Sequence, residues 1–165
     1  MNKKVNLFII LVLISISQLF AQPNKSLQEF YTDFYMEKIK TNPLSSTYED
    51  ATGSPYLEKE FIEGTILMKN QKKYIIPLRF NIYSDNFEFK INNEAIAIEN
   101  PNSILNIDLD NCTYIYYNLN KRNSFVELIV SGKNNLICKK EVILKKAEPA
   151  GAYKEPKPAS FIRKT

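Results

Sequence analysis

Residues 73–83, KYIIPLRFNIY, give the first indication of the fold class. Its even positions are all apolar, and its odd positions include Pro77, Arg79 and Asn81. Alternation with a period of two is typical of a half-buried β-strand, with one face toward the core and one toward water. Because proline has no N–H to donate to a neighbouring strand, Pro77 predicts an edge strand or a bulge at this point.

The same alternation continues in a series of short segments. Turn-forming residues separate them, among them Ser84-Asp85-Asn86 and Asn92-Asn93. The predicted strands are 73–83, 87–91, 94–98, 105–110, 112–117, 124–131 and 135–145, with a hairpin loop at 132–134. Such short, turn-separated strands predict an all-β fold with a mainly antiparallel sheet, either a sandwich or a partly open barrel.

One helical pattern precedes the strands. Between Leu27 and Ile39, apolar residues recur at spacings of three and four, which places them on one face of a helix predicted at 27–40. Ser26 and Glu29 have the spacing of a capping box at its start. We expect this helix to pack on the sheet or to be loosely tethered to it.

The N-terminus has the three parts of a secretory signal peptide. Lys3 and Lys4 precede an apolar run at 5–16, and Ala21 is a small residue suited to cleavage. The run is shorter than the roughly 20 residues that span a bilayer, which favours cleavage over a permanent anchor. We expect an exported protein, in the periplasm or outside the cell, with attachment to the outer membrane as a further alternative. The predicted organisation is a signal peptide at 1–21, an N-terminal segment at 22–61, an antiparallel β domain at 62–146 and a proline-rich tail with a terminal strand at 147–165.

The composition excludes several classes of function. The 165 residues include no histidine, two cysteines and four scattered glycines. This excludes His-dependent triads, His-ligated metals, four-cysteine clusters and glycine-rich phosphate loops. Without residues 1–21 the chain has 20 basic and 18 acidic residues, a net charge of +2. That charge is too small for a nucleic-acid footprint, so no nucleic-acid partner is expected.

We predict no catalytic, cofactor-binding or metal-binding residue. Asn106, Asp108 and Asp110 lie on one face of a predicted strand and offer oxygen ligands to calcium, but the polar face of any amphipathic strand has the same pattern.

Cys112 and Cys138 fall on two predicted strands with a third strand between them. The two strands are then about 9.6 Å apart, which is too far for a disulfide. A twisted or closed sheet is the alternative that would bring them together.

Tyr83, Tyr114, Tyr116 and Tyr117 are candidates for stacking on sugar rings or contacting a partner protein, although tyrosine is also a common strand residue. A hydrolase without histidine needs a Ser–Lys pair or two carboxylates, and no S-x-x-K motif occurs. We therefore expect a non-catalytic binding or structural module that contacts a protein or glycan through a sheet face or edge. A hydrolase with an Asp/Glu pair assembled by the fold and a small outer-membrane β-barrel are the alternatives.

Three stretches keep a recognisable order along the chain: GSPYL at 53–57, IPLRFNIY at 76–83, and EPA with PASF at 148–150 and 158–161. They resemble an exported, β-rich protein family of Bacteroidota-type bacteria that has no assigned activity. The resemblance implies a signal peptide and a β-rich body, and it supplies no catalytic residues. Members usually continue past the final Phe-Ile-Arg-Lys segment, so the resemblance also implies an absent hairpin and an open strand edge at the end of this chain.

Overall fold

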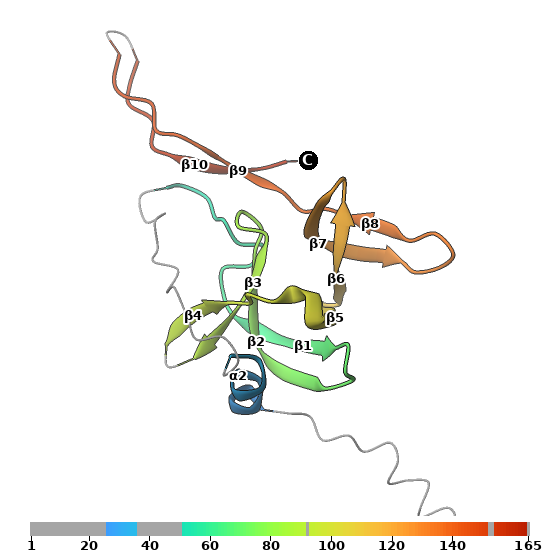
Figure 1. Cartoon of the computed structure of the whole chain (residues 1–165). Coiled ribbons are helices and arrows are strands. Elements are labelled where there is room, and N and C mark those ends of the chain that lie inside the picture. The colour runs from blue at the N-terminus through green and yellow to red at the C-terminus, as the bar shows by residue number, and fades with distance from the viewer. Residues whose placement is uncertain (1–25, 36–50, 92, 152–153, 165) are drawn as a thin grey trace, which may run out of the picture.

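The computed structural model describes residues 26–35, 51–91, 93–151 and 154–164 (Figure 1). The predicted signal peptide at 1–21 and the last part of the predicted helix, 36–40, lie outside the described residues. The elements are α2 (Leu27–Tyr35), β1 (Ile62–Met68), β2 (Lys73–Asn81), β3 (Asn86–Ile91), β4 (Glu94–Ala97), the 3-10 helix η1 (Pro101–Ser103), β5 (Ile104–Leu109), β6 (Cys112–Leu119), β7 (Arg122–Val130), β8 (Leu136–Cys138), β9 (Val142–Lys145) and β10 (Ser160–Arg163).

Two antiparallel sheets contain all of these strands. Eight strands form one sheet in the order β4-β3-β2-β1-β5-β6-β7-β8, and β9 pairs with β10 in a second. Several hairpin turns contain residues with positive φ, such as Asn93, Asp110 and Asn120, as tight turns between antiparallel strands require. The predicted fold class, all-β and mainly antiparallel with a short N-terminal helix, is confirmed.

The eight-stranded sheet curls until its two halves face each other. In a flat sheet, five strand spacings of about 4.8 Å would put β3 and β7 roughly 24 Å apart. Instead, the ring centroids of Phe87 on β3 and Phe125 on β7 are 4.9 Å apart, and those of Phe80 on β2 and Tyr114 on β6 are 5.4 Å apart. These four residues, the aromatic cluster, are at most 2% exposed. They form the part of the core that joins the two halves.

Gly64 lies on β1, next to the middle of the strand order. A Cβ at this position would lie 2.9 Å from a terminal methyl of Leu78 on β2 and 2.9 Å from one of Leu109 on β5. Both leucines are buried, and they come from the strands on either side of β1. The missing side chain therefore lets the neighbouring strands close over β1.

The predicted capping box is present at the start of α2. The Ser26 N–H donates to the Glu29 carboxylate at 2.8 Å, and the Glu29 N–H donates to Ser26 Oγ at 3.4 Å. Phe30 is fully buried, with its ring centroid 5.0 Å from that of Tyr74 and 5.2 Å from that of Phe89. The helix thus packs on the sheet rather than being loosely tethered to it.

Residues 53–57, which we call the strap, connect the two sheets. At one end, the Leu57 N–H donates to the Phe80 carbonyl on β2 at 2.9 Å. At the other end, Gly53 has a φ of +86°, and a Cβ there would lie 2.8 Å from the backbone oxygen of Phe161 on β10. Only glycine adopts that conformation at such a close approach without strain. The strap therefore holds the β9–β10 sheet against the end of β2.

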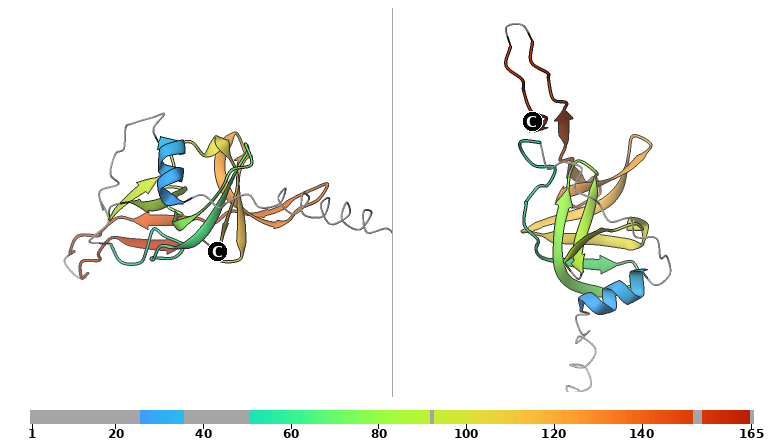
Figure 2. Two further views of the ribbon diagram at one scale, coloured as in Figure 1. Left: turned by 90° about the horizontal axis from the view of Figure 1, so that it is seen from below. Right: turned by 90° about the vertical axis from the view of Figure 1, so that its left-hand side faces the viewer.

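Residues 146–151 and 154–159 form an arm that extends beyond β9 and β10 (Figure 2). Isolated bridges join Glu148 to Lys157 and Gly151 to Lys154 across it. The arm points away from the body, at the end of the molecule opposite to α2 (Figure 2).

Two strand-level predictions are wrong. The strand containing Pro77 is not an edge strand: β2 lies between β1 and β3, and its register with β1 runs without a shift through Pro77. Pairing with β3 begins only at Leu78, so no β3 residue pairs with Pro77.

The predicted strand 135–145 is divided by residues 139–141 into β8 and β9, which belong to different sheets. The consecutive charges of Lys139, Lys140 and Glu141 interrupt the alternation at this point.

We expect Gly64→Ala to lower the free energy of unfolding by about 1–3 kcal/mol, the usual cost of overpacking a core. The added methyl group must displace the buried side chains of Leu78 and Leu109. Gly132→Ala is the matched control, because the nearest atom to its added Cβ is 3.7 Å away, and we expect a change within about 0.5 kcal/mol. Urea denaturation of both variants measures the difference. Equal effects would contradict the role given to Gly64.

Candidate functional site

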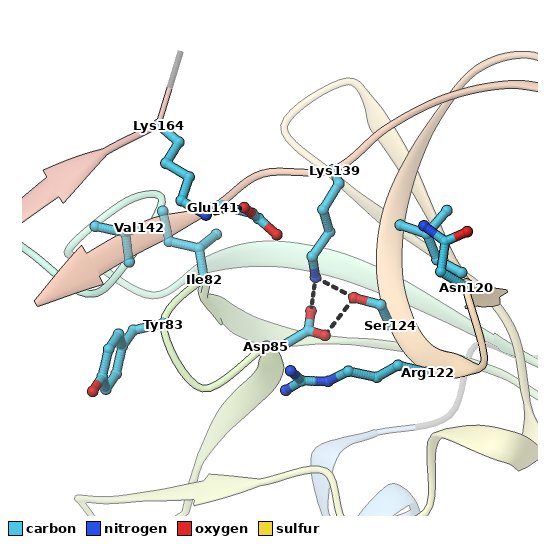
Figure 3. A pocket seen from close by; sticks show the side chains of 11 residues that line it. Ile82, Tyr83, Asp85, Asn120, Arg122, Ser124, Lys139, Glu141, Val142 and Lys164 are labelled. Atoms are coloured by element: carbon cyan, nitrogen blue, oxygen red, sulfur yellow. Dashed lines mark hydrogen bonds and ion pairs between the residues drawn. The ribbon is translucent and has the colours of Figure 1, made fainter.

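A pocket of about 450 Å³ lies where the eight-stranded sheet meets the second sheet (Figure 3). Its lining comes from the β2–β3 turn, the β6–β7 turn, the start of β7, the link between β8 and β9, and the end of β10. We call it the Ser124 pocket. Most of its lining is polar, and Ile82, Leu119 and Val142 are its aliphatic residues.

Ser124, Lys139 and Asp85 contact one another in this pocket (Figure 3). Lys139 Nζ donates to Asp85 Oδ1 and to Ser124 Oγ, and it also donates to the Phe125 carbonyl oxygen at 3.3 Å. The Ser124 hydroxyl donates to Asp85 Oδ2. The side chains of Lys139 and Asp85 are 19% and 13% exposed. This network connects the β2–β3 turn, β7 and the β8–β9 link.

Local backbone features place each member of the network. Asp85 has a φ of +58° in the β2–β3 turn, a conformation that aspartate tolerates better than most residues. Ser124 is a buried residue of β7 that pairs with Tyr117 on β6. Lys139 directly follows the end of β8, where the chain leaves the large sheet. Lys139 therefore lies outside the strand, and its side chain can turn back toward β7.

The Ser124–Lys139 contact has the residue types of a Ser–Lys hydrolase but not the required hydrogen bonds. In such an enzyme a neutral lysine removes the serine proton, so its nitrogen needs a free lone pair. The three donors of the Lys139 ammonium are directed at a carboxylate, a hydroxyl and a carbonyl. Ser124 itself donates to Asp85. These bonds favour a structural role for the network.

The Ser124–Lys139 contact was not predicted, because the sequence contains no S-x-x-K motif, the spacing in which one helical turn joins the two residues. Here the two residues are 15 positions apart, and a hairpin joins them. The predicted strands 124–131 and 135–145 form a hairpin about the loop at 132–134. In that hairpin, Ser124 pairs near the end of strand 135–145. The run of charged residues at 139–141 was the signal that the strand ends there.

Arg122, Glu141 and Lys164 also line the pocket. Lys164 Nζ lies 2.9 Å from Glu141 Oε2, and this hydrogen bond is the main reason that the pKa of Glu141 lies below its ordinary value. The positive charges of Lys164, Lys139 and Arg122 lower that pKa further, against a smaller opposing effect of burial. Within the described part of the chain, Arg122 has no carboxylate in ion-pair contact. Of the three cations in the pocket, Arg122 therefore has an available guanidinium.

The carboxylates of the Ser124 pocket and the buried Glu88 give little support to hydrolysis by an Asp/Glu pair. Such a mechanism needs one carboxyl group that donates a proton to the leaving group. In the Ser124 pocket, Asp85 is paired with Lys139 and Glu141 with Lys164. The fully buried Glu88 lies 2.6 Å from Arg79. All three carboxylates act as acceptors for cationic side chains.

The acidic residues considered for calcium binding do not share one strand face. Asp108 lies on β5, where its Oδ1 accepts hydrogen bonds from Asn106 at 3.1 Å and Thr113 at 2.7 Å. Asp110 lies beyond the end of β5, in the turn to β6, with a φ of +48°. The prediction that Asp108 and Asp110 lie on one strand is wrong because the hairpin turn begins at Asp110. Within the described residues, no group of three acidic or thiol side chains is arranged to hold a metal ion.

Cys112 and Cys138 are both free, as predicted. They lie on β6 and β8, and β7 separates these strands. Burial is the main reason that the pKa of Cys112 is raised, and a hydrogen bond to Glu127 raises it further. Lys140 forms a 2.8 Å ion pair with Glu127, and its hydrogen bond is the largest cause of the lowered pKa of Glu127. Cys112 therefore remains a thiol at neutral pH.

The four candidate tyrosines have different environments. Tyr114 belongs to the aromatic cluster and is buried. Tyr83 lines the Ser124 pocket, whereas Tyr116 lines a second hollow of about 260 Å³ that also borders on Asp85 and Arg122. Tyr117 is exposed on β6. Two of the four thus lie beside hollows that share Arg122.

The outer edge of β8 has no strand partner within the described residues. Near this edge, the end of the β7–β8 hairpin exposes Ile129, Val130 and Leu136, at 49%, 54% and 57%. The hairpin extends from the body of the molecule (Figure 1). Large aliphatic side chains beside an unpaired strand edge are typical of a surface that contacts another chain.

Comparison with family models, curated proteins and solved structures gave no match to this chain. The family resemblance of residues 53–57, 76–83 and 158–161 therefore stays a prediction. In the structure these stretches are neighbours: the strap bonds to β2 and lies against β10. Their residues make structural contacts between the two sheets. In the described part of the chain, no helix is both long enough and apolar enough to cross a bilayer.

We expect Lys139→Met to lower the free energy of unfolding by about 1.5–3 kcal/mol, because it leaves the Asp85 carboxylate without its ion partner. The double variant Lys139→Met/Asp85→Asn should recover part of this loss, since it removes the unpaired charge. Lys133→Met, in the exposed β7–β8 loop, is the control and should change stability by less than about 0.5 kcal/mol. Chemical denaturation gives the double-mutant cycle, and strictly additive effects would show that the two side chains are not coupled.

Proposed function

We propose that this protein is an exported, non-catalytic β module that acts through binding, and that the outer edge of β8 pairs with a second copy of the chain. The observation that carries the proposal is the unpaired edge of β8, next to the exposed side chains of Ile129, Val130 and Leu136. Added strands bind such edges through main-chain hydrogen bonds, and neighbouring side chains give the contact its apolar area.

The sequence of β8 supports a second copy as the partner. In a two-fold antiparallel pairing centred on Ile137, Leu136 faces Cys138 of the other copy, so apolar side chains meet on both sides of the axis. A two-fold interface of this kind is closed, and it covers the edge of both chains.

Two observations support binding rather than catalysis. The Ser124–Lys139 pair is part of a salt-bridged network in which the lysine donates to three acceptors. The carboxylates of the same pocket are paired with lysines. Neither arrangement provides a free base or a proton donor for hydrolysis.

The proposal places the protein in the periplasm or outside the cell, on the basis of residues 1–21. We expect the exported protein to begin at Gln22, because Ala21 ends the predicted signal peptide. N-terminal sequencing and mass spectrometry of the protein recovered outside the cytoplasm give the result directly. Recovery of the intact chain with Met1, held in the inner membrane, would contradict export with cleavage.

Light scattering across a concentration series tests pairing through β8. We expect the wild-type mass to rise toward two chains, and we expect Leu136→Lys to remain at one chain because it brings a charged side chain from each copy into the apolar two-fold contact. Ile143→Lys is the matched control: Ile143 is also an exposed aliphatic strand residue but lies on β9. This control should associate as the wild type does.

A wild-type chain that stays monomeric at the highest concentration tested would overturn the proposed partner. Equal loss of association in both variants would place the contact elsewhere than at β8. The helical and sheet content of each variant, measured by circular dichroism, separates loss of association from loss of fold.

A further inference from the structure

The Ser124 pocket has features of a ligand site that are independent of the β8 edge. Asp85 and Glu141 are satisfied by lysines, whereas Arg122 has no carboxylate in ion-pair contact among the described residues. In the described part of the chain, Arg122 is therefore the one cation of the pocket that is available to a ligand, because the other charged side chains of the pocket are paired with one another. A planar guanidinium with several N–H donors is well suited to a carboxylate, which it binds through two parallel hydrogen bonds.

Arg122 borders two hollows rather than one. The Ser124 pocket has a volume of about 450 Å³, and the hollow of about 260 Å³ shares both Asp85 and Arg122 with it. Figure 3 shows the Arg122 side chain beside Asp85, below the Ser124–Lys139 contact. A ligand held by Arg122 can therefore extend into both hollows. The larger volume lies within the range of small-molecule sites.

The residues around the two hollows favour a ligand with many hydroxyl groups. Asn120 lines the first hollow, and Ser84 and Asn123 line the second, so hydrogen-bonding groups are present along both. Tyr83 borders the first hollow and Tyr116 the second. Polar side chains beside aromatic rings are suited to sugars, whose rings have hydroxyl edges and less polar faces.

We propose that the two hollows bind an acidic oligosaccharide, and that Arg122 contacts the carboxylate of one sugar unit. Each hollow accommodates part of the chain of sugars, with Arg122 between them. The network of Ser124, Lys139 and Asp85 holds the wall of the site in place, and no covalent step takes place there. This site goes beyond the proposed pairing through β8, and neither depends on the other.

Titration calorimetry with a glucuronate-containing disaccharide, and with the neutral disaccharide that lacks its carboxylate, tests the proposal. We expect the acidic disaccharide to bind at least tenfold more tightly than the neutral one. Arg122→Gln should weaken binding of the acidic disaccharide roughly ten- to hundredfold, the loss of hydrogen bonds to a charged group. Lys121→Gln is the matched control. It removes the same positive charge from the residue next to Arg122, and the Lys121 side chain lines neither hollow.

Three results would overturn the proposal. They are equal affinity for the acidic and neutral disaccharides, equal weakening by Arg122→Gln and Lys121→Gln, and acetate binding as tightly as the acidic disaccharide. The last result would identify a simple anion site without sugar recognition. Thermal unfolding of both variants confirms that the comparison is made on folded protein. Light scattering on Arg122→Gln should match the wild type, which separates this site from pairing through β8.

Discussion

Contact between the two halves of one curled sheet holds this fold together. The aromatic cluster brings β2 and β3 against β6 and β7, although four strands separate β3 from β7 in the sheet order. Large rings bury much apolar area and gain further from edge-to-face contacts, so this packing compensates for the strong curvature of the sheet. Gly64 makes the curvature sterically possible, because the side chains of Leu78 and Leu109 occupy the space above it.

The position of the Ser124 pocket follows from this curl. The β2–β3 turn and the start of β7 are distant along a flat sheet, but they become neighbours when the halves close. Asp85 then contacts Ser124, and Lys139 completes the network from the link where β8 ends. A second largely buried ion pair, Arg79 with the fully buried Glu88, lies where the strap bonds to β2. Breaking either ion pair would leave an unpaired charge in a place that water hardly reaches. Both pairs therefore favour the observed arrangement of the segments around them.

The chemistry of the pocket depends on which hydrogen bonds are already made. Serine and lysine in contact form a reactive pair only when the lysine nitrogen has a free lone pair, and here Asp85, Ser124 and the Phe125 carbonyl accept its hydrogens. Arg122 differs from Lys139, because its guanidinium has no carboxylate in ion-pair contact among the described residues. The pocket is therefore better suited to holding an anion than to transferring a proton.

Most local elements of this protein could be predicted from its amino-acid sequence. Strand alternation, turn residues and the capping box of Ser26 and Glu29 act over a few neighbouring residues, so their patterns are visible without the fold. By contrast, the position of Pro77 on an interior strand, the division of two sheets at 139–141 and the contact of Ser124, Lys139 and Asp85 could not be predicted. These features depend on strand order and on the curl of the sheet. The strand order and the curl are set by contacts between side chains that are far apart in the sequence. The alternation of apolar and polar residues along one strand carries no information about such contacts.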